Sequence, residues 1–354
     1  MIVKKIIGFL VFTLMVMVSL GLATAFAQAP NFRINFNVPI RGDISVDMGA
    51  VVVVNPNKVN NGSTVLVLNG TGQTSITFQP FADKTFTDKI GKKISRFVLL
   101  NYPGHANSSL PISKSGANFG SLTLSDYVTA LIESIKVLDN IGIAPDFIMG
   151  HSLGAEMLHL AQDRLITQGT SFRKQFGVKG AFFVVPDIVG PVPWGFADSG
   201  TGTAVVQMLT VNDPLEGTVV RFPPPVWLAF FYGDLAGKIA SQAPTPADAA
   251  QRFITDDSRL MAAEFVGALG SRPLVTEGIF ADSQGTISGL VGLEQDGIYT
   301  QAEHKALYTY LTKDKAATMF FFLTGPTTVH NQHVFEPSAL LEPFRKVFAK
   351  ANKK

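Results

Sequence analysis

Residues 144–162, APDFIMGHSLGAEMLHLAQ, constrain the fold of this chain more than any other stretch. They begin with a short apolar run, Asp146 to Met149, which has the length and composition of a buried strand. A serine between two glycines follows it. A helix is then indicated by apolar residues at helical spacing, namely Met157, Leu158, Leu160 and Leu165. The pattern predicts a strand, a tight turn and a helix in direct succession, with Ser152 in the turn and no room for larger side chains at Gly150 and Gly154.

Strands and helices are predicted to alternate on both sides of this stretch. The predicted strands are 64–68, 96–100, 146–149, 181–185, 287–293 and 318–323. The predicted helices are 124–138, with Thr123 or Ser125 as its cap, about 301–311, and about 338–349. A β-meander is expected at 33–60. This order predicts an α/β fold with a mainly parallel central sheet and flanking helices.

The first 27 residues have the features of a secretory signal peptide. Lys4 and Lys5 precede an uncharged apolar run from Ile6 to Leu22, and Ala25-Phe26-Ala27 fits the small-residue rule for cleavage. The alternative is a membrane anchor, because the apolar run is near the lower length limit for spanning a bilayer. We expect cleavage after Ala27, export to the periplasm or the medium without a stable membrane anchor, and a single domain over 28–354.

Charge and composition exclude several kinds of partner. Without Lys4 and Lys5 the basic and acidic residues number 27 each, so the exported chain has no net charge to attract nucleic acid. The chain has no cysteine, which excludes a disulfide framework. Gly70-Thr71-Gly72 lacks the third glycine of a dinucleotide fingerprint, and the histidines do not show H-E-x-x-H spacing. We therefore expect neither a cofactor nor a metal.

Residues 190–275 interrupt the alternation of strands and helices. They contain many prolines and both tryptophans of the chain. We interpret them as a cap-like insertion over the sheet, with an irregular part of the core as the alternative. Aromatic residues of the insertion are candidates to line an apolar binding pocket, although they are also typical of a core. These candidates are Trp227, Phe230 and Phe231, together with Phe222 and Tyr232.

The motif Gly150-His151-Ser152-Leu153-Gly154 matches G-x-S-x-G between a predicted strand and a predicted helix. In that setting it resembles the nucleophile elbow of the α/β-hydrolase superfamily. The resemblance covers about residues 60–350, apart from the insertion. It implies that Ser152 is a nucleophile and that the backbone N–H groups of Leu153 and Thr71 form an oxyanion hole.

Two loops add to the resemblance and also depart from the superfamily pattern. Residues 67–72, VLNGTG, are similar to the first-loop His-Gly segment, with Asn69 in place of the common histidine. Residues 100–108 are similar to the D-x-x-G-x-G-x-S loop, with Asn101 and Ala106 as departures. Neither loop carries the attacking group, so we expect the departures to affect substrate shape more than chemistry.

The resemblance implies that the catalytic base follows the nucleophile and the acid along the chain. His330 and His333 lie in the loop after the last predicted strand, where the superfamily places its base. We favour His330 and keep His333 as the alternative. The other histidines are set aside by their positions, and His304 is predicted to be a solvated surface residue. Those set aside are His105, His151, His159 and His304.

The acid is expected at the end of the preceding strand. Asp296 lies in a turn between the predicted strand 287–293 and the predicted helix that follows, which resembles the superfamily pattern. An aspartate that only caps the turn is the alternative for this residue. Asp187, Asp234 and Asp282 also end apolar runs and are the competing acids.

These roles predict a serine hydrolase that cleaves a carboxylic ester or lactone, most simply a lipophilic one, through a Ser-His-Asp triad and an acyl-enzyme. Other triad chemistry, such as amide cleavage or cofactor-free perhydrolysis, is the alternative among enzymes. A module that binds an apolar ligand without turnover is the alternative outside them. The expected partner is a small ester molecule, and the oligomeric state is left open.

Overall fold

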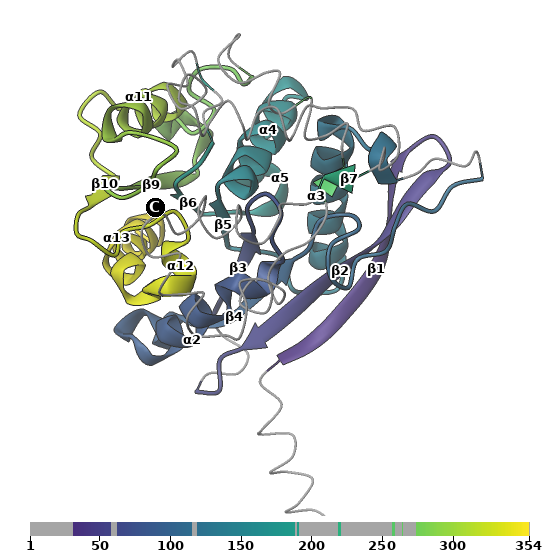
Figure 1. Ribbon diagram of the computed structural model, residues 1–354, viewed down its shortest axis with the longest axis horizontal. Coiled ribbons are helices and arrows are strands. Elements are labelled where there is room, and N and C mark those ends of the chain that lie inside the picture. The colour runs from purple at the N-terminus through teal and green to yellow at the C-terminus, as the bar shows by residue number, and fades with distance from the viewer. Residues whose placement is uncertain are drawn as a thin grey trace, which may run out of the picture.

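The computed structural model describes residues 31–57, 62–114, 119–187 and 274–353, together with 190, 219–220, 257–258 and 264. Eight strands form one sheet in the order β1-β2-β4-β3-β5-β6-β9-β10 (Figure 1). The long hairpin of β1 and β2 pairs antiparallel to β4, and every later pair in the sheet is parallel. The predicted mainly parallel α/β sheet is confirmed.

The strands of the sheet lie close to the predicted ranges. They are β1 (Asn31–Arg41), β2 (Ile44–Val54), β3 (Ser63–Leu68), β4 (Ile94–Leu100), β5 (Phe147–His151), β6 (Gly180–Val184), β9 (Ile287–Leu293) and β10 (Phe320–Leu323). Strands β5, β6 and β9 are buried along their whole length, as expected for strands covered on both faces. In contrast, β10 is only half-buried, because it forms the outer edge of the sheet.

Helices cover both faces of the sheet (Figure 1). One face packs against α3 (Leu124–Asn140), α4 (Leu153–Thr167) and α11 (Gln301–Thr312). The other face packs against α2 (Gln79–Thr87) and α13 (Leu341–Ala351). The other helical segments of the described residues are short: η1 (Ser75–Phe78), η2 (Lys89–Lys93), η3 (Phe119–Ser121), α5 (Phe172–Phe176), η6 (Asp282–Gln284), α12 (Gln332–Phe335) and η7 (Pro337–Leu340).

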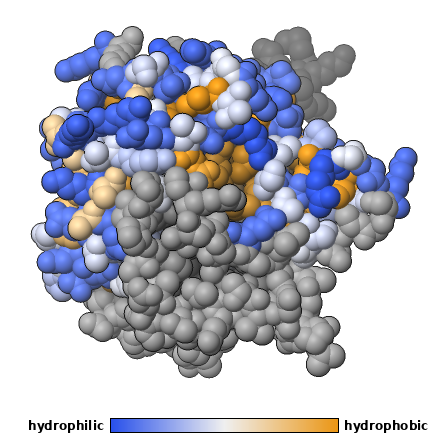
Figure 2. Space-filling model, turned by 90° about the horizontal axis from the view of Figure 1, so that it is seen from above, coloured by the Kyte–Doolittle hydropathy of each residue, from blue (hydrophilic) through white to orange (hydrophobic). Residues whose placement is uncertain are grey.

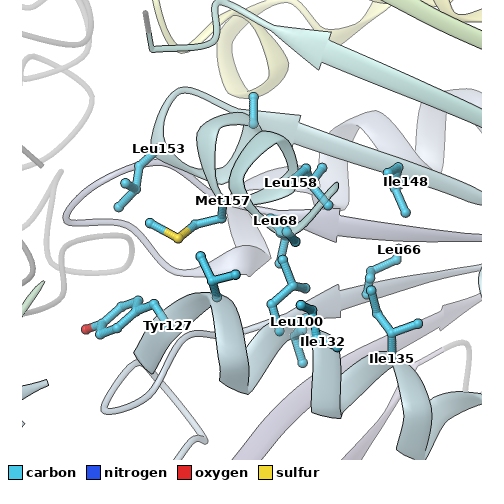
Figure 3. Close-up of a cluster of buried hydrophobic side chains, with 14 of the residues drawn as sticks. Leu66, Leu68, Leu100, Tyr127, Ile132, Ile135, Ile148, Leu153, Met157 and Leu158 are labelled. Carbon is cyan, nitrogen blue, oxygen red and sulfur yellow. The ribbon is translucent and has the colours of Figure 1, made fainter. Parts of the chain in front are cut away.

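Alternate residues of the central strands build two separate cores. Leu66 and Leu68 of β3 belong to the core under α3 and α4, whereas Val65 and Val67 belong to the core under α2 and α13. Figure 3 shows the first core, where the β3 leucines lie beside Ile135 of α3 and other buried side chains of α3 and α4. Burying both faces in this way fixes the register of each strand.

The predicted helix starts are confirmed where caps are present. Thr123 caps α3, its hydroxyl accepting from the backbone N–H of Asp126 while the Asp126 carboxylate accepts from that of Thr123. The predicted final helix is divided into the 3₁₀ turn η7 and α13. Of the described helices, none is long and apolar enough to cross a membrane.

Seen from above, the surface formed by the described residues is mostly hydrophilic (Figure 2). Hydrophobic residues gather near the centre of the view. Most of the predicted insertion lies outside the described residues, and so does the predicted signal peptide. Within the insertion, Val219–Val220 and Asp257–Ser258 pair as a short antiparallel ladder.

Candidate active site

Ser152 occupies a strained turn between β5 and α4. Its backbone has φ +50° and ψ −126°, a region that residues other than glycine rarely adopt. The Ser152 N–H donates to the carbonyl of Val184 in β6 at 3.1 Å, which ties the turn to the neighbouring strand. The turn therefore presents the Ser152 side chain at the carboxyl ends of the parallel strands.

The two glycines of the motif are required by close backbone contacts. A Cβ at Gly150 would lie 2.5 Å from the backbone nitrogen of Ala155. A Cβ at Gly154 would lie 2.5 Å from the carbonyl oxygens of Leu68 and Asn69. Real Cβ atoms do not approach backbone this closely, so the predicted need for small residues is confirmed at both positions.

The loop after β3 lies against the turn. A Cβ at Gly70 would meet the Cβ of Ser152 at 3.1 Å. Thr71 follows it and is almost buried, at 6% exposure. Leu153 is the first residue of α4, where backbone N–H groups have no partner within the helix. The candidate donors Leu153 and Thr71 thus belong to two segments that meet at Ser152.

His330 and Asp296 form a buried pair beside the turn. Nδ1 of His330 and Oδ1 of Asp296 are 3.1 Å apart, and their side chains are 1% and 0% exposed. The same Asp296 oxygen accepts from the backbone N–H of Ile298 at 3.0 Å. His151 donates from Nε2 to the His330 carbonyl at 2.9 Å. These bonds fix the His330 backbone and one side of its ring.

His333 lies on the other side of His151. Its ring stacks on Phe78 with centroids 4.0 Å apart and lies 4.3 Å from the His151 ring. Burial, with a smaller effect of His330, holds the pKa of His333 well below its ordinary value. The structure therefore brings Asp296 to His330, while His333 packs against aromatic rings.

Asp187, one of the competing acids, contacts Ser152. The Ser152 hydroxyl lies 3.4 and 3.3 Å from the two carboxylate oxygens of Asp187, and Tyr299 donates to one of them at 2.7 Å. Asp187 is 4% exposed. Burial raises its pKa to about 6, although the bond from Tyr299 opposes this rise.

Glu156 lies in the first turn of α4 and is completely buried. Its carboxyl oxygens have no hydrogen-bond partner among the described residues. Burial first, and then the charge of Asp187, raise the pKa of Glu156 well above its ordinary value. Burial therefore favours the protonated form of Glu156 near Asp187, since an uncompensated buried carboxylate is costly.

Solved structures similar to this chain include three hydrolases described by different activities. An esterase from Thermogutta terrifontis is 13% identical with a TM-score of 0.58, covering 90% of this chain and 99% of its own. An enol-lactonase from Burkholderia xenovorans is 12% identical with a TM-score of 0.57, covering 89% and 100%. A juvenile hormone epoxide hydrolase from Bombyx mori is 11% identical with a TM-score of 0.54, covering 90% and 76%. No family model and no curated protein matches the sequence.

The chain has the α/β-hydrolase fold. The expected resemblance to the α/β-hydrolase superfamily is thus confirmed at the level of the fold. In this α/β-hydrolase fold, Ser152 follows β5, Asp187 follows β6, Asp296 follows β9 and His330 follows β10. Parallel strands end at the same edge of the sheet, which explains how residues far apart in sequence meet there.

The prediction for His304 is wrong. It was expected on the surface of its helix, but it is 0% exposed and packs against Tyr299, with ring centroids 5.2 Å apart. The helix turns this residue toward Gly292 of β9, where glycine leaves space for the imidazole. Burial lowers the pKa of His304 to about 4.

The other histidines set aside are buried as well. His159 packs against Phe183 and Phe280 on the far side of α4 from the turn, and burial lowers its pKa to about 3. His105 is 3.1 Å from the carbonyl of Gln73 through Nδ1.

The remaining candidates are placed away from the site or outside the described residues. Asp282 precedes β9 and so lies at the opposite edge of the sheet. Asp234 and the aromatic candidates lie outside the described residues; the latter are Trp227, Phe230, Phe231, Phe222 and Tyr232.

Sequence reasoning missed Glu156 and Tyr299 and ranked Asp187 below Asp296. A charged residue between apolar ones in the first turn after the serine, and a tyrosine three residues after Asp296, were the available signals. Neither signal indicates the contact, because that depends on how neighbouring strand ends meet.

Proposed function

We propose that the protein is a serine hydrolase that cleaves a carboxylic ester or lactone, with Ser152 as nucleophile, His330 as base and Asp296 as acid. The observation that carries the proposal is the convergence of the strained Ser152 turn with the buried His330–Asp296 pair at one edge of the sheet. Strained backbone of this kind is concentrated at functional sites.

The proposed chemistry follows from the protonation of His330. If Nδ1 donates to Asp296, Nε2 carries the lone pair of the neutral ring and is available as the base. Ser152 attacks the carbonyl carbon while His330 takes its proton, and Asp296 stabilises the resulting imidazolium. Backbone N–H groups of Leu153 and Thr71 hold the oxyanion, each contributing about 3 to 4 kcal/mol. Protonation of the leaving alcohol by His330 gives the acyl-enzyme, which water hydrolyses.

Several features support an ester or lactone as substrate. The similar structures include proteins described as an esterase and an enol-lactonase. Epoxide hydrolysis, the activity for which the Bombyx mori protein is named, is disfavoured because the resemblance implies an aspartate at the turn for that chemistry. We also propose that the aromatic residues of the insertion form a lipophilic pocket and that the protein is exported.

A panel of aryl esters of graded chain length, with a lactone and an anilide, tests the proposal on the mature protein. We expect ester or lactone turnover that Ser152→Ala abolishes and that Asp296→Asn lowers by about 10⁴-fold. Asp282→Asn is the matched control, because Asp282 lies at the opposite edge of the sheet. Binding of the panel without turnover would support the non-catalytic alternative.

The same panel tests the proposed apolar pocket. Each methylene buried in such a pocket adds about 0.8 kcal/mol, so kcat/KM is expected to rise with acyl length. Equal kcat/KM for short and medium acyl chains would refute a deep apolar pocket.

A further inference from the structure

We propose that Asp187 is a second carboxylate of the active site that restrains the Ser152 hydroxyl, and that Tyr299 positions Asp187 for this role. The proposal rests on the proposed function, because it concerns the proton that Ser152 must give to its base. It differs from the triad in that Asp187 acts on Ser152 directly and opposes the transfer to His330.

The backbone at the end of β6 supports a dedicated position for Asp187. Val185 has φ +39°, which is a rare conformation for a β-branched residue. The adjacent strand β5 is followed by Ser152 with φ +50°, and the bond from the Ser152 N–H to the Val184 carbonyl joins the two segments. Each of two neighbouring strands is therefore followed by a residue with positive φ, and beyond them the side chains of Ser152 and Asp187 meet.

The hydrogen bonds around Asp187 define the restraint. A serine hydroxyl has one proton to donate, and a carboxylate only accepts. Ionised Asp187 therefore competes with the base for the Ser152 proton, and bonds to a charged acceptor are the stronger ones. Protonated Asp187 can instead donate to Ser152 and leave the serine proton for the base.

Tyr299 holds the carboxylate in place. Its hydroxyl donates to Oδ1 of Asp187 at 2.7 Å, a shorter contact than those to Ser152. Tyr299 comes from the loop that also supplies Asp296 to His330. One loop thus supports both carboxylates, each with its own partner.

Among the described residues, titratable groups on three elements interact with Asp187. They are Glu156 of α4, Tyr299 and Asp296 of the loop after β9, and His330 of the loop after β10. His304 of α11 lies nearby, at the backbone of Pro186. Burial raises the pKa of Asp187 most, Tyr299 and His330 lower it, and Asp296 raises it. The pKa of Glu156 is raised well above its ordinary value, by burial first and then by the charge of Asp187.

Rates of labelling by a fluorophosphonate between pH 5 and pH 9 test the restraint. Asp187→Asn keeps an acceptor for Tyr299 and offers an amide donor to Ser152, so the serine proton is free for the base. We expect the variant to label faster than wild type at pH 8 by about two- to tenfold, the effect of one hydrogen bond. The ratio should approach one at pH 5, where wild-type Asp187 is protonated.

Other results of this experiment overturn the proposal. A variant slowed by the same factor at every pH shows a structural role, and an inactive variant shows that Asp187 is an essential acid. Equal rates at pH 8 show that Asp187 does not restrain Ser152. Thermal unfolding checks that Asp187→Asn is folded. Tyr299→Phe is a second variant. It is expected to move the pH at which the labelling rate changes to a higher value than in wild type.

Carbon NMR titration of labelled aspartates separates failure of this proposal from failure of the proposed function. Removing either hydrogen bond, with Ser152→Ala or Tyr299→Phe, is expected to raise the pKa of Asp187, because each bond favours the charged form. This readout needs no turnover. If the pKa of Asp187 is unchanged in Ser152→Ala, the proposed restraint of Ser152 by Asp187 is wrong, even if the enzyme is active. If the pKa of Asp187 shifts as expected but the fluorophosphonate does not label the wild type, the proposed hydrolase function alone is contradicted.

Discussion

At the scale of single residues, two carboxylates lie at the candidate site, and each is held by a different partner. Asp187 accepts from Tyr299, and Asp296 lies 3.1 Å from His330, a pairing that the order of the predicted strands along the chain indicated. The same reasoning could not find the contact of Asp187 with Ser152. That contact depends on the positive φ of Val185, a backbone conformation that valine itself disfavours and that its sequence neighbours do not indicate.

The choice between the two histidines gives a first prediction. His330→Ala should lower turnover by about 10⁶-fold, like loss of the nucleophile, because it removes the base. His333→Ala should keep measurable turnover with altered substrate affinity, since His333 packs against Phe78 and His151. Kinetics on both folded variants would reverse the assignment if His333→Ala were inactive and His330→Ala were not.

Buried Glu156 gives a prediction about stability. Its pKa is raised in the folded state, so the folded chain binds a proton more tightly and loses stability as pH rises from the ordinary glutamate range. Glu156→Gln removes this loss of stability, so at pH 9 it should unfold at a higher denaturant concentration than wild type. Its free energy of unfolding should be larger by about 1.4 kcal/mol for each unit of pKa shift. At pH 4 the two proteins should be closely matched. A variant less stable than wild type at both pH values would contradict the burial of a neutral acid.

At the scale of elements, periodicity and caps predicted most strands and helices. The capping box at Thr123 and Asp126 fixed the start of α3, and uninterrupted apolar runs gave the buried strands. The half-burial of β10 was not evident from the sequence, because residues 320–323 are all apolar. Their exposure depends on the position of β10 at the edge of the sheet. His304 was missed because only a space at Gly292 accommodates its ring.

The turn between β5 and α4 gives a prediction at this scale. Gly154→Ala should destabilise the fold by about 1 to 3 kcal/mol, because the new methyl group collides with the Leu68 and Asn69 carbonyls. Gly297→Ala is the matched control, since nothing lies within 4 Å of its Cβ position. Chemical denaturation of both variants measures the difference, and equal stability would show that the turn is looser than described.

At the scale of the whole molecule, the fold is retained at very low identity. The chain is similar in structure, with TM-scores of 0.54 to 0.58, to solved structures at 11 to 13% identity, although residues 67–72 and 100–108 depart from the superfamily pattern. Burying strands on both faces requires apolar character and register rather than particular side chains. That explains why the sequence predicted the fold readily, whereas the proposed insertion pocket, which depends on particular aromatic residues, stays a prediction.

Acid sensitivity is a property of the whole molecule that two buried histidines predict. In the folded state the pKa is about 3 for His159 and about 4 for His304, both below the ordinary value. The stability that the two neutral rings contribute is therefore fully present above pH 6.5 and is lost as the pH falls toward these values. Each proton taken up only on unfolding changes stability by about 1.4 kcal/mol per pH unit. Between pH 6.5 and pH 4, His159→Phe should lose less stability than wild type, when each protein is compared with its own stability at pH 8. An unchanged slope in chemical denaturation would contradict the neutral buried imidazole.

The central claim is that Ser152 is the nucleophile, and locating a covalent label tests it most directly. The mature protein is treated with a fluorophosphonate, digested and analysed by mass spectrometry, alongside Ser152→Ala. We predict a single adduct on the peptide that contains Ser152 and no adduct in the variant. An adduct on another residue, or labelling of Ser152→Ala at the wild-type rate, would contradict the account.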